Sequence, residues 1–578
     1  MNRIFTSVIV IATLSCISSE SRKKFSEDTY RYWPSYQYLE VENLDTIIAQ
    51  TWIEKDSVIS GWDWSLPSWI VPSPRSMVGL QRRVGLNTPF QPLNLKFKSN
   101  AVGVLWVKWR DLEPTIGNYN FEPLVDRIKQ ANSLGLEVVL RILGHSKLRG
   151  YDDLALSRGD APLWLEDLGV NFLPKRDSIK YPRDNLNFDP AHPEFHKRYL
   201  MLVEELAKSG IPEMVIAAYV GYASPTNGDE GIGPYREQEM IANDTVQHVK
   251  ERLDTWGKAF EGMEYKIYMG GTSHYGLKKG FGIRRGFVEM YMYRIPDSDL
   301  GQYIDEKGYL AVDEDAPILR YRCFNGDENE EYEEVWATKS REFRFGPNTD
   351  SYPYRYFTST LRALQMRCTY ILATGHLLPK MVPFMSLELG RTVEDTPDVW
   401  TFLRTSYIRG DYYKSQDDGA REITTEEMVE GITTKNFERW LFQRDSPGYE
   451  TQPAIRIDHP IAMWMIQKDK YYDYIARSGK RIGFDIDDQW GHSKNQIAIK
   501  VTYFDNTSGD MILKFSGGKN MKSIKLKGDG NLKTATFYVS SMEPNSMDNN
   551  YDFILEASDN TESIIISMVR VVGARSNI

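Results

Sequence analysis

The feature that most constrains this chain is an alternation of apolar runs with amphipathic stretches, which extends from residue 102 to residue 410. The apolar runs lie at residues 102–109, 136–143, 213–222, 265–271, 286–293, 317–324 and 381–389. The stretches between several of them carry apolar residues at the spacing of an α-helix. Strands that are apolar along their whole length and alternate with helices are typical of a parallel sheet covered on both faces.

Counting residues 61–66 as the first strand gives eight, and the span favours an eight-fold β/α barrel with insertions. A doubly wound open sheet is the alternative, but it usually carries a glycine-rich phosphate turn after its first strand, and the sequence shows none. From residue 478 the pattern changes to short alternating runs separated by Gly, Asn, Asp and Ser, as in an antiparallel sandwich. We therefore predict an α/β fold with a (β/α)8 TIM barrel over residues 30–410, a connector packed on it over 411–477, and a C-terminal antiparallel β-sandwich over 478–578.

The N-terminus has the pattern of an export signal. Arg3 is followed by an uncharged, mostly apolar run at residues 4–14, which is too short to span a bilayer and suits a secretory signal. The run ends in ATLSC, which is similar to a bacterial lipobox. We predict a signal peptide over residues 1–16, lipidation of Cys16, and a lipoprotein of the outer membrane or periplasm. Plain secretion with a different cleavage site is the alternative.

Composition excludes several classes of protein. There are 70 basic and 80 acidic residues, for a net charge of −10, and the sequence has no Lys/Arg cluster of the size that a nucleic-acid binder usually presents. The eight histidines show no H-E-x-x-H or H-x-H spacing, and G-x-S-x-G is absent. Beyond the signal only Cys323 and Cys368 remain, too few for a disulfide framework or a zinc site. We expect no nucleic acid, no metal, no cofactor, and membrane contact only through a lipid anchor.

Acidic residues follow two of the predicted strands. The loop after the predicted fourth strand carries Asp229 and Glu230, and the loop after the seventh carries the acids of residues 327–331. In a β/α barrel the loops at the carboxyl ends of the strands converge on one mouth. Glycoside hydrolysis needs two carboxyl groups that face each other across the scissile bond. The alternative is that Glu230 stabilises the N-terminus of a helix and that the acids of residues 327–331 are solvent-exposed residues at the start of another helix.

Residues 102–142 resemble the second and third β/α units of clan-A glycoside hydrolases, most closely the family-42 β-galactosidases and related bacterial galactan-degrading enzymes. The motif W-x-x-L-E-P-x-x-G-x-Y-x-F is matched by Trp109, Leu112, Glu113, Pro114, Gly117, Tyr119 and Phe121. The resemblance implies a retaining mechanism with Glu230 as general acid/base and Glu328 as nucleophile. Glu330 is an alternative nucleophile, and Glu388 becomes one if the strand count shifts by one. The sequence departs from the clan at Asp229, where an asparagine is usual.

Further residues near predicted strand ends are candidates for substrate contact, namely Trp109, His145, Asp229, His274, Arg284 and Tyr293. The aromatic and histidine side chains could equally be core residues, and Arg284 could be a surface charge instead of a clamp on a sulfate or carboxylate. We interpret Glu113 as structural. The predicted function is a glycoside hydrolase that cleaves a β-linked galactan-type polysaccharide or oligosaccharide, with sulfated algal galactans among the candidate substrates. A non-catalytic glycan-binding surface lipoprotein on a barrel scaffold is the main alternative, and a polysaccharide lyase is a third.

Overall fold

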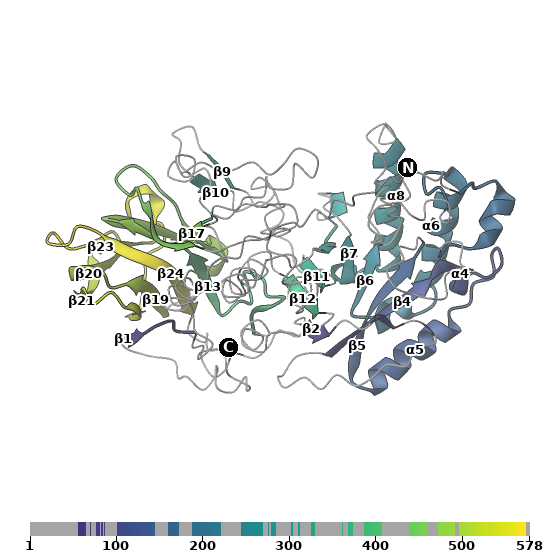
Figure 1. Ribbon diagram of the computed structural model, residues 1–578, viewed down its shortest axis with the longest axis horizontal. Coiled ribbons are helices and arrows are strands. Elements are labelled where there is room, and N and C mark those ends of the chain that lie inside the picture. Colours follow the sequence, from purple (N-terminus) through teal and green to yellow (C-terminus); the bar gives the residue numbers. More distant parts are fainter. Residues whose placement is uncertain are drawn as a thin grey trace, which may run out of the picture.

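The structure is a computed structural model, shown in Figure 1. It describes residues 56–64, 70, 77–80, 83–84, 86, 101–144, 160–172, 188–220, 244–269, 275–276, 279–284, 302–304, 310–312, 325–329, 361, 364, 368–373, 387–406, 439–458, 472–491 and 496–573. Among these residues no helix has both the length and the apolar character needed to cross a bilayer.

One sheet is parallel at every pairing, and its order is β2-β12-β11-β8-β7-β6-β5-β4-β3. Its strands are β2 (Met77–Leu80), β3 (Arg83–Val84), β4 (Ala101–Lys108), β5 (Leu136–Leu143), β6 (Ala217–Val220), β7 (Ile267–Met269), β8 (Gly282–Arg284), β11 (Asn325–Asn329) and β12 (Cys368–Ala373). The first and last strands in this order, β2 and β3, follow each other directly in the chain. If they are counted as one, the sheet has eight strands.

Helices connect these strands along the chain. They are α4 (Trp109–Leu112), α5 (Glu122–Ser133), η1 (Leu163–Leu168), α6 (Pro193–Ala207), α7 (Ile211–Met214), α8 (Asp244–Ala259) and η4 (Glu264–Lys266). Helix α5 buries Leu124, Ile128 and Ala131, which lie on one face at helical spacing. Helix α6 begins with a proline at its first position, and the side chain of His192 before it accepts a hydrogen bond from the Glu194 amide. Figure 1 shows α6 and α8 side by side.

Strands β4, β5, β6 and β7 fall within or close to their predicted ranges, and these predictions are confirmed. Three others are wrong. Residues 61–64 of the predicted first strand are not a strand, β12 lies between the runs 317–324 and 381–389 where a helix at residues 354–373 was expected, and Leu387–Leu389 of the predicted eighth strand begins a helical turn. Short apolar runs suit a buried strand and a buried helix equally, so periodicity does not separate the two.

Two antiparallel sheets form the second part of the molecule. The eight-stranded sheet holds β1 (Ser57–Ser60), β13 (Asp398–Phe402), β14 (Thr405–Ser406), β16 (Gln452–Asp458), β17 (Tyr472–Gly479), β19 (Ile497–Phe504), β22 (Leu532–Val539) and β24 (Ile564–Gly573). The five-stranded sheet holds β15 (Leu441–Gln443), β18 (Arg481–Ile486), β20 (Ser508–Phe515), β21 (Asn520–Lys527) and β23 (Phe553–Ala557). Smaller elements are the hairpin of β9 (Gln302–Ile304) and β10 (Leu310–Val312), α17 (Asp488–Gly491) and η7 (Asp548–Asn550).

A shared apolar core holds these two sheets face to face. Ile499, Phe537 and Val569 of the larger sheet are in one buried cluster with Phe484 and Leu513 of the smaller sheet. The antiparallel sandwich predicted from the alternating runs is therefore present.

The sandwich draws on more of the chain than the predicted range 478–578. Strand β1 precedes the parallel sheet in sequence and pairs with β22, and β13 pairs with β24. Strands β14, β15, β16 and most of β17 also come from before residue 478. The boundary at residue 478 is wrong for this reason, because the strand pairs that define the sandwich join segments far apart in sequence.

Candidate active site

The two strands expected to present catalytic acids are the fourth and the seventh of the parallel sheet. Counted from β2 and β3 as one strand, β6 is the fourth and β11 is the seventh. Glu230 lies beyond the end of β6 and outside the described residues. Glu328 lies within β11, where its backbone is the register partner of Leu372 in β12. The acids of residues 327 and 328 are thus in the strand itself, and not in a loop after it as the sequence predicted.

Near the carboxyl ends of four neighbouring strands, a buried arginine packs against aromatic rings. The guanidinium carbon of Arg141 in β5 is 4.2 Å from the ring centroid of Trp106 in β4 and 5.4 Å from that of Tyr219 in β6. Tyr268 in β7 meets Tyr219 edge-on, with 6.5 Å between the ring centroids. We call Trp106, Arg141, Tyr219 and Tyr268 the arginine–aromatic cluster.

Strand register explains why these side chains meet. Trp106 is the register partner of Arg141, and Tyr219 is the register partner of Tyr268. Register partners in a parallel sheet point to the same face, so the four side chains share one face. None of these four residues was predicted to form such a cluster. The signal available was a single arginine inside the otherwise apolar end of the run LEVVLRIL.

A second contact joins the end of β4 to the segment at residue 160. The ammonium nitrogen of Lys108 is 3.5 Å from a carboxylate oxygen of Asp160, and the Arg110 amide donates to the Asp160 carbonyl. Burial raises the pKa of Asp160, while the charges of Lys108 and Arg110 act in the opposite direction. Lys108 is about one-third exposed, with a side-chain exposure of 35%, so its ammonium group is accessible at this edge of the sheet.

The motif that carries the family resemblance is a structural unit. Trp109 is fully buried, and its indole nitrogen donates to a carboxylate oxygen of Glu113 at 2.9 Å. The other carboxylate oxygen accepts from the amide of Gly117, whose φ of 73° favours glycine. The Trp109 ring packs edge-on against Phe195 and Tyr199 of α6. Trp109 therefore cannot stack on a sugar, and its predicted role in substrate binding is wrong, whereas the structural interpretation of Glu113 is confirmed.

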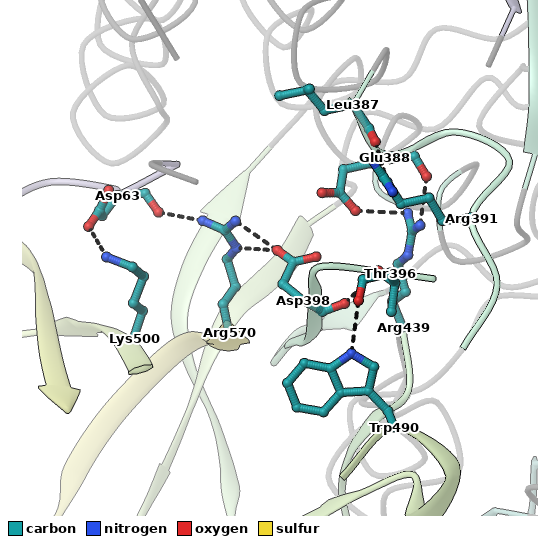
Figure 2. Close-up of polar contacts among 10 residues, drawn as sticks. All are labelled: Asp63, Leu387, Glu388, Arg391, Thr396, Asp398, Arg439, Trp490, Lys500 and Arg570. Carbon is teal, nitrogen blue, oxygen red and sulfur yellow. Dashed lines mark hydrogen bonds and ion pairs between the residues drawn. The ribbon is translucent and has the colours of Figure 1, made fainter. Parts of the chain in front are cut away.

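Glu388 lies in the turn before β13, and Figure 2 shows it beside Arg439. Its carboxylate is fully buried 3.3 Å from a guanidinium nitrogen of Arg439, and Arg439 also donates to the Glu388 carbonyl at 2.6 Å. Burial raises the pKa of Glu388 to about 8, with a further increase from Asp398, while Arg439 opposes the shift. The eighth parallel strand is β12, which ends at Ala373. Glu388 was an alternative nucleophile on the assumption that a barrel strand ends at residue 389. That assumption is wrong.

The other predicted site residues are placed only in part. Arg284 is the last residue of β8, and its backbone is the register partner of Gly326 in β11. Only the backbone is described at Arg284 and Glu328. Cys16, His145, Asp229, Glu230, His274, Tyr293 and Glu330 lie outside the described residues. Among the residues that are described, three side chains that could hold a metal ion together lie on helices α6 and α8, not on the strands.

Comparisons with known proteins give distant similarities only. No protein-family model and no curated protein matches the chain. Among solved structures, the chain is similar to the catalytic domain of β-amylase from Paenibacillus polymyxa (11% identity, 55% of this chain and 98% of that one, TM-score 0.32). It is also similar to endo-glycoceramidase II from Rhodococcus sp. (10% identity, 88% and 100%, TM-score 0.30) and to exo-β-1,4-mannosidase Op5Man5 from Opitutaceae bacterium strain TAV5 (12% identity, 55% of each chain, TM-score 0.28).

The names of these three proteins are those of glycoside hydrolases. TM-scores this low do not support an inference of function from these proteins. The function of the present chain is therefore argued from its own residues. The resemblance to the family-42 β-galactosidases and the galactan specificity stay predictions.

Proposed function

We propose that this chain is a retaining glycoside hydrolase, with Glu230 as general acid/base and Glu328 as nucleophile at the carboxyl ends of a closed eight-stranded β/α barrel. One observation carries the proposal. Along the order of the parallel sheet, the strand that leads toward Glu230 is the fourth and the strand that contains Glu328 is the seventh.

The sheet order also supports closure into a barrel. Its two end strands, β2 and β3, are close neighbours in the chain, and β2 pairs with β12 while β3 pairs with β4. Closure of the sheet into a barrel, which would leave it no free edge, is proposed from this proximity of its two ends. Eight strands and intervening helices correspond to the β/α barrel, whose active sites lie at the carboxyl ends of the strands.

The proposed reaction follows from two carboxyl groups in different protonation states. Glu230 donates a proton to the leaving oxygen while Glu328 attacks the anomeric carbon, and the covalent glycosyl-enzyme is then hydrolysed by water that Glu230 deprotonates. Asp229 beside Glu230 supplies a like charge that helps keep Glu230 protonated. The cation of Arg141 on the same sheet adds a favourable electrostatic environment for an ionised group near it.

For the substrate we propose a β-linked galactan-type polysaccharide or oligosaccharide, sulfated galactans included. Arg284, at the end of β8 beside β11, is the residue that we propose to contact an anionic group on the sugar. We also propose that the protein is exported and anchored through a lipid on Cys16. Both proposals rest on the sequence. The substrate proposal rests also on the position of Arg284 next to the strand of Glu328.

The direct test is an activity screen of the purified chain on sulfated and unsulfated galactans, with release of reducing ends as the readout. Release of reducing ends by the wild type, lost in the Glu230→Gln variant, supports the proposal. Saturable binding without new reducing ends would favour the glycan-binding alternative. Products that absorb in the ultraviolet through a new double bond would favour a lyase.

A further inference from the structure

Helices α6 and α8 bring together three side chains of the kinds that ligate transition metals. Nε2 of His196 in α6 is 3.0 Å from a carboxylate oxygen of Glu251 in α8. The rings of His196 and His248 are stacked, with 4.4 Å between their centroids and 10° between their planes. One ligand atom from each of the three residues lies within 4.8 Å of the other two.

The two helices hold this group in place from both sides. His248 and Glu251 are three residues apart on α8 and so lie on the same helix face. The other carboxylate oxygen of Glu251 accepts a hydrogen bond of 3.0 Å from the Gln247 side chain, which leaves Oε2 directed at His196. Deeper between the helices, the indole nitrogen of Trp256 donates to the Tyr199 hydroxyl at 3.2 Å. The Glu251 carboxylate is thus held against His196 by its own contacts, as outer contacts orient metal ligands in known sites.

Two imidazoles and one carboxylate are a ligand set that zinc uses in catalytic sites. An ion about 2.0–2.2 Å from each ligand atom needs those atoms roughly 3–3.6 Å apart and lies in the plane of each imidazole, so binding requires the stacked rings of His196 and His248 to turn out of their parallel arrangement. The Arg252 charge opposes a nearby cation, and the Glu251 carboxylate offsets it.

We propose that His196, His248 and Glu251 bind one divalent transition-metal ion of the zinc class between α6 and α8. Three protein ligands leave at least one coordination position for water or an external ligand. The site is carried by helices and not by the strands that carry Glu328 and the arginine–aromatic cluster, so it is independent of the proposed hydrolase chemistry. The sequence patterns H-E-x-x-H and H-x-H miss it, because His196 and Glu251 are separated by 55 positions on two helices.

The test uses the full chain after treatment with a chelator and dialysis. Zn²⁺ is titrated by calorimetry, Co²⁺ is titrated by its visible absorption, and thermal unfolding is measured with and without Zn²⁺. We expect one saturable Zn²⁺ equivalent, a visible Co²⁺ spectrum of an ordered low-coordinate site, and a rise in Tm with Zn²⁺, because a ligand that binds only the folded state stabilises it.

The double variant His248→Ala/Glu251→Gln should bind Zn²⁺ at least about a hundred-fold more weakly and lose the Tm rise. The matched control is His192→Asn, which removes an imidazole at the start of α6 but keeps a side chain able to cap the helix, and it should bind Zn²⁺ like the wild type. If the double variant does not fold, Glu251→Gln alone serves, because that side chain is partly exposed. Absence of saturable binding in the wild type, or equal binding in the ligand variants, would show that the three residues form only a hydrogen-bonded helix contact.

Discussion

Arg141 of β5 and Trp106 of β4 are register partners in adjacent parallel strands, and the guanidinium of Arg141 lies over the Trp106 ring. The arginine is 1% exposed, and Tyr219 of the next strand covers it from another side. A guanidinium packed on an indole face is stabilised by roughly 0.5–2 kcal/mol, with the larger value where water is excluded. Charge and aromatic surface are thus concentrated near the carboxyl ends of the strands, where the proposed reaction takes place.

Lysine in place of Arg141 should not preserve this contact, because its ammonium group lacks the planar guanidinium that stacks on Trp106. We expect Arg141→Lys and Arg141→Met to lower the free energy of unfolding by about 1–3 kcal/mol and to lower activity on the proposed substrate. Urea denaturation followed by tryptophan fluorescence measures the first effect. The control is Lys129→Met on the exposed side of α5, which should change stability by less than about 0.5 kcal/mol. An Arg141→Lys variant as stable and active as the wild type would show that the stacking contact contributes to neither stability nor activity.

Glu230→Gln should lower the rate on an unactivated galactan by about 10²–10⁴-fold, because the leaving oxygen then has no proton donor. Substrate binding should change little. Initial rates of reducing-end release, with binding measured separately, give both quantities.

Glu328→Gly should be inactive and recover turnover when azide is added, with a glycosyl azide as the product, because a small anion takes the place of the missing nucleophile. Glu330→Gly is the matched control, since it removes a carboxylate from the same acidic run and leaves the same space for azide. If azide rescues a Glu330→Gly variant and not Glu328→Gly, the nucleophile is Glu330.

Glu113 holds the β4–α5 connection through two hydrogen bonds, a buried one from Trp109 and a partly buried one from the Gly117 amide. Glu113→Ala leaves the buried Trp109 donor without its acceptor, whereas water can reach the partly buried Gly117 amide, so we expect a loss of about 1–3 kcal/mol. Glu113→Gln keeps an acceptor oxygen and should lose less. Glu261→Ala at an exposed position is the control. A loss no larger for Glu113→Ala than for Glu261→Ala would contradict the structural role.

Glu388 should make stability depend on pH. Its pKa is raised from 4.5 to about 8 by burial, so between these values the folded state binds more protons at this site than the unfolded state. This contribution to stability is fully present below pH 4.5 and is lost as the pH rises toward 8, at a rate of at most about 1.4 kcal/mol per pH unit.

Glu388→Gln should remove that slope, so the variant gains stability relative to the wild type as the pH rises from 5 to 8. Urea midpoints at each pH measure the difference. Glu562→Gln, at an exposed position of the same sandwich, is the control and should follow the wild type. Parallel curves for Glu388→Gln and the wild type over this range would contradict the raised pKa.

Asp63 and Lys500 form a buried ion pair of 2.5 Å that joins the segment after β1 to β19, and Arg570 donates to the Asp63 carbonyl beside it (Figure 2). Lys500→Met leaves a buried carboxylate without its cation and should cost about 3–5 kcal/mol. The double variant Asp63→Leu/Lys500→Met removes both charges and should recover most of that loss. A double-mutant cycle of unfolding free energies measures the coupling, and strictly additive losses would rule it out.

Local sequence patterns predicted several of the strands and the presence of the sandwich. Alternation of apolar runs and helices predicted β4, β5, β6 and β7, and the short alternating runs of the last part of the chain predicted the sandwich. The pair Trp109 and Glu113 was visible as a motif, although only the structure shows that Trp109 is buried. Periodicity of this kind reports that one face of an element is buried, because that face must leave water wherever the element packs.

The packing partner of each buried face became visible in the folded chain. The pairing of β1 with β22, the location of Glu388 beside Arg439, the stacking of Arg141 on Trp106 and the meeting of His196 with Glu251 all join residues that no local pattern links. Such contacts depend on strand register and helix packing across long stretches of chain. Those are set by the free energy of the whole fold and not by the residues next to each position.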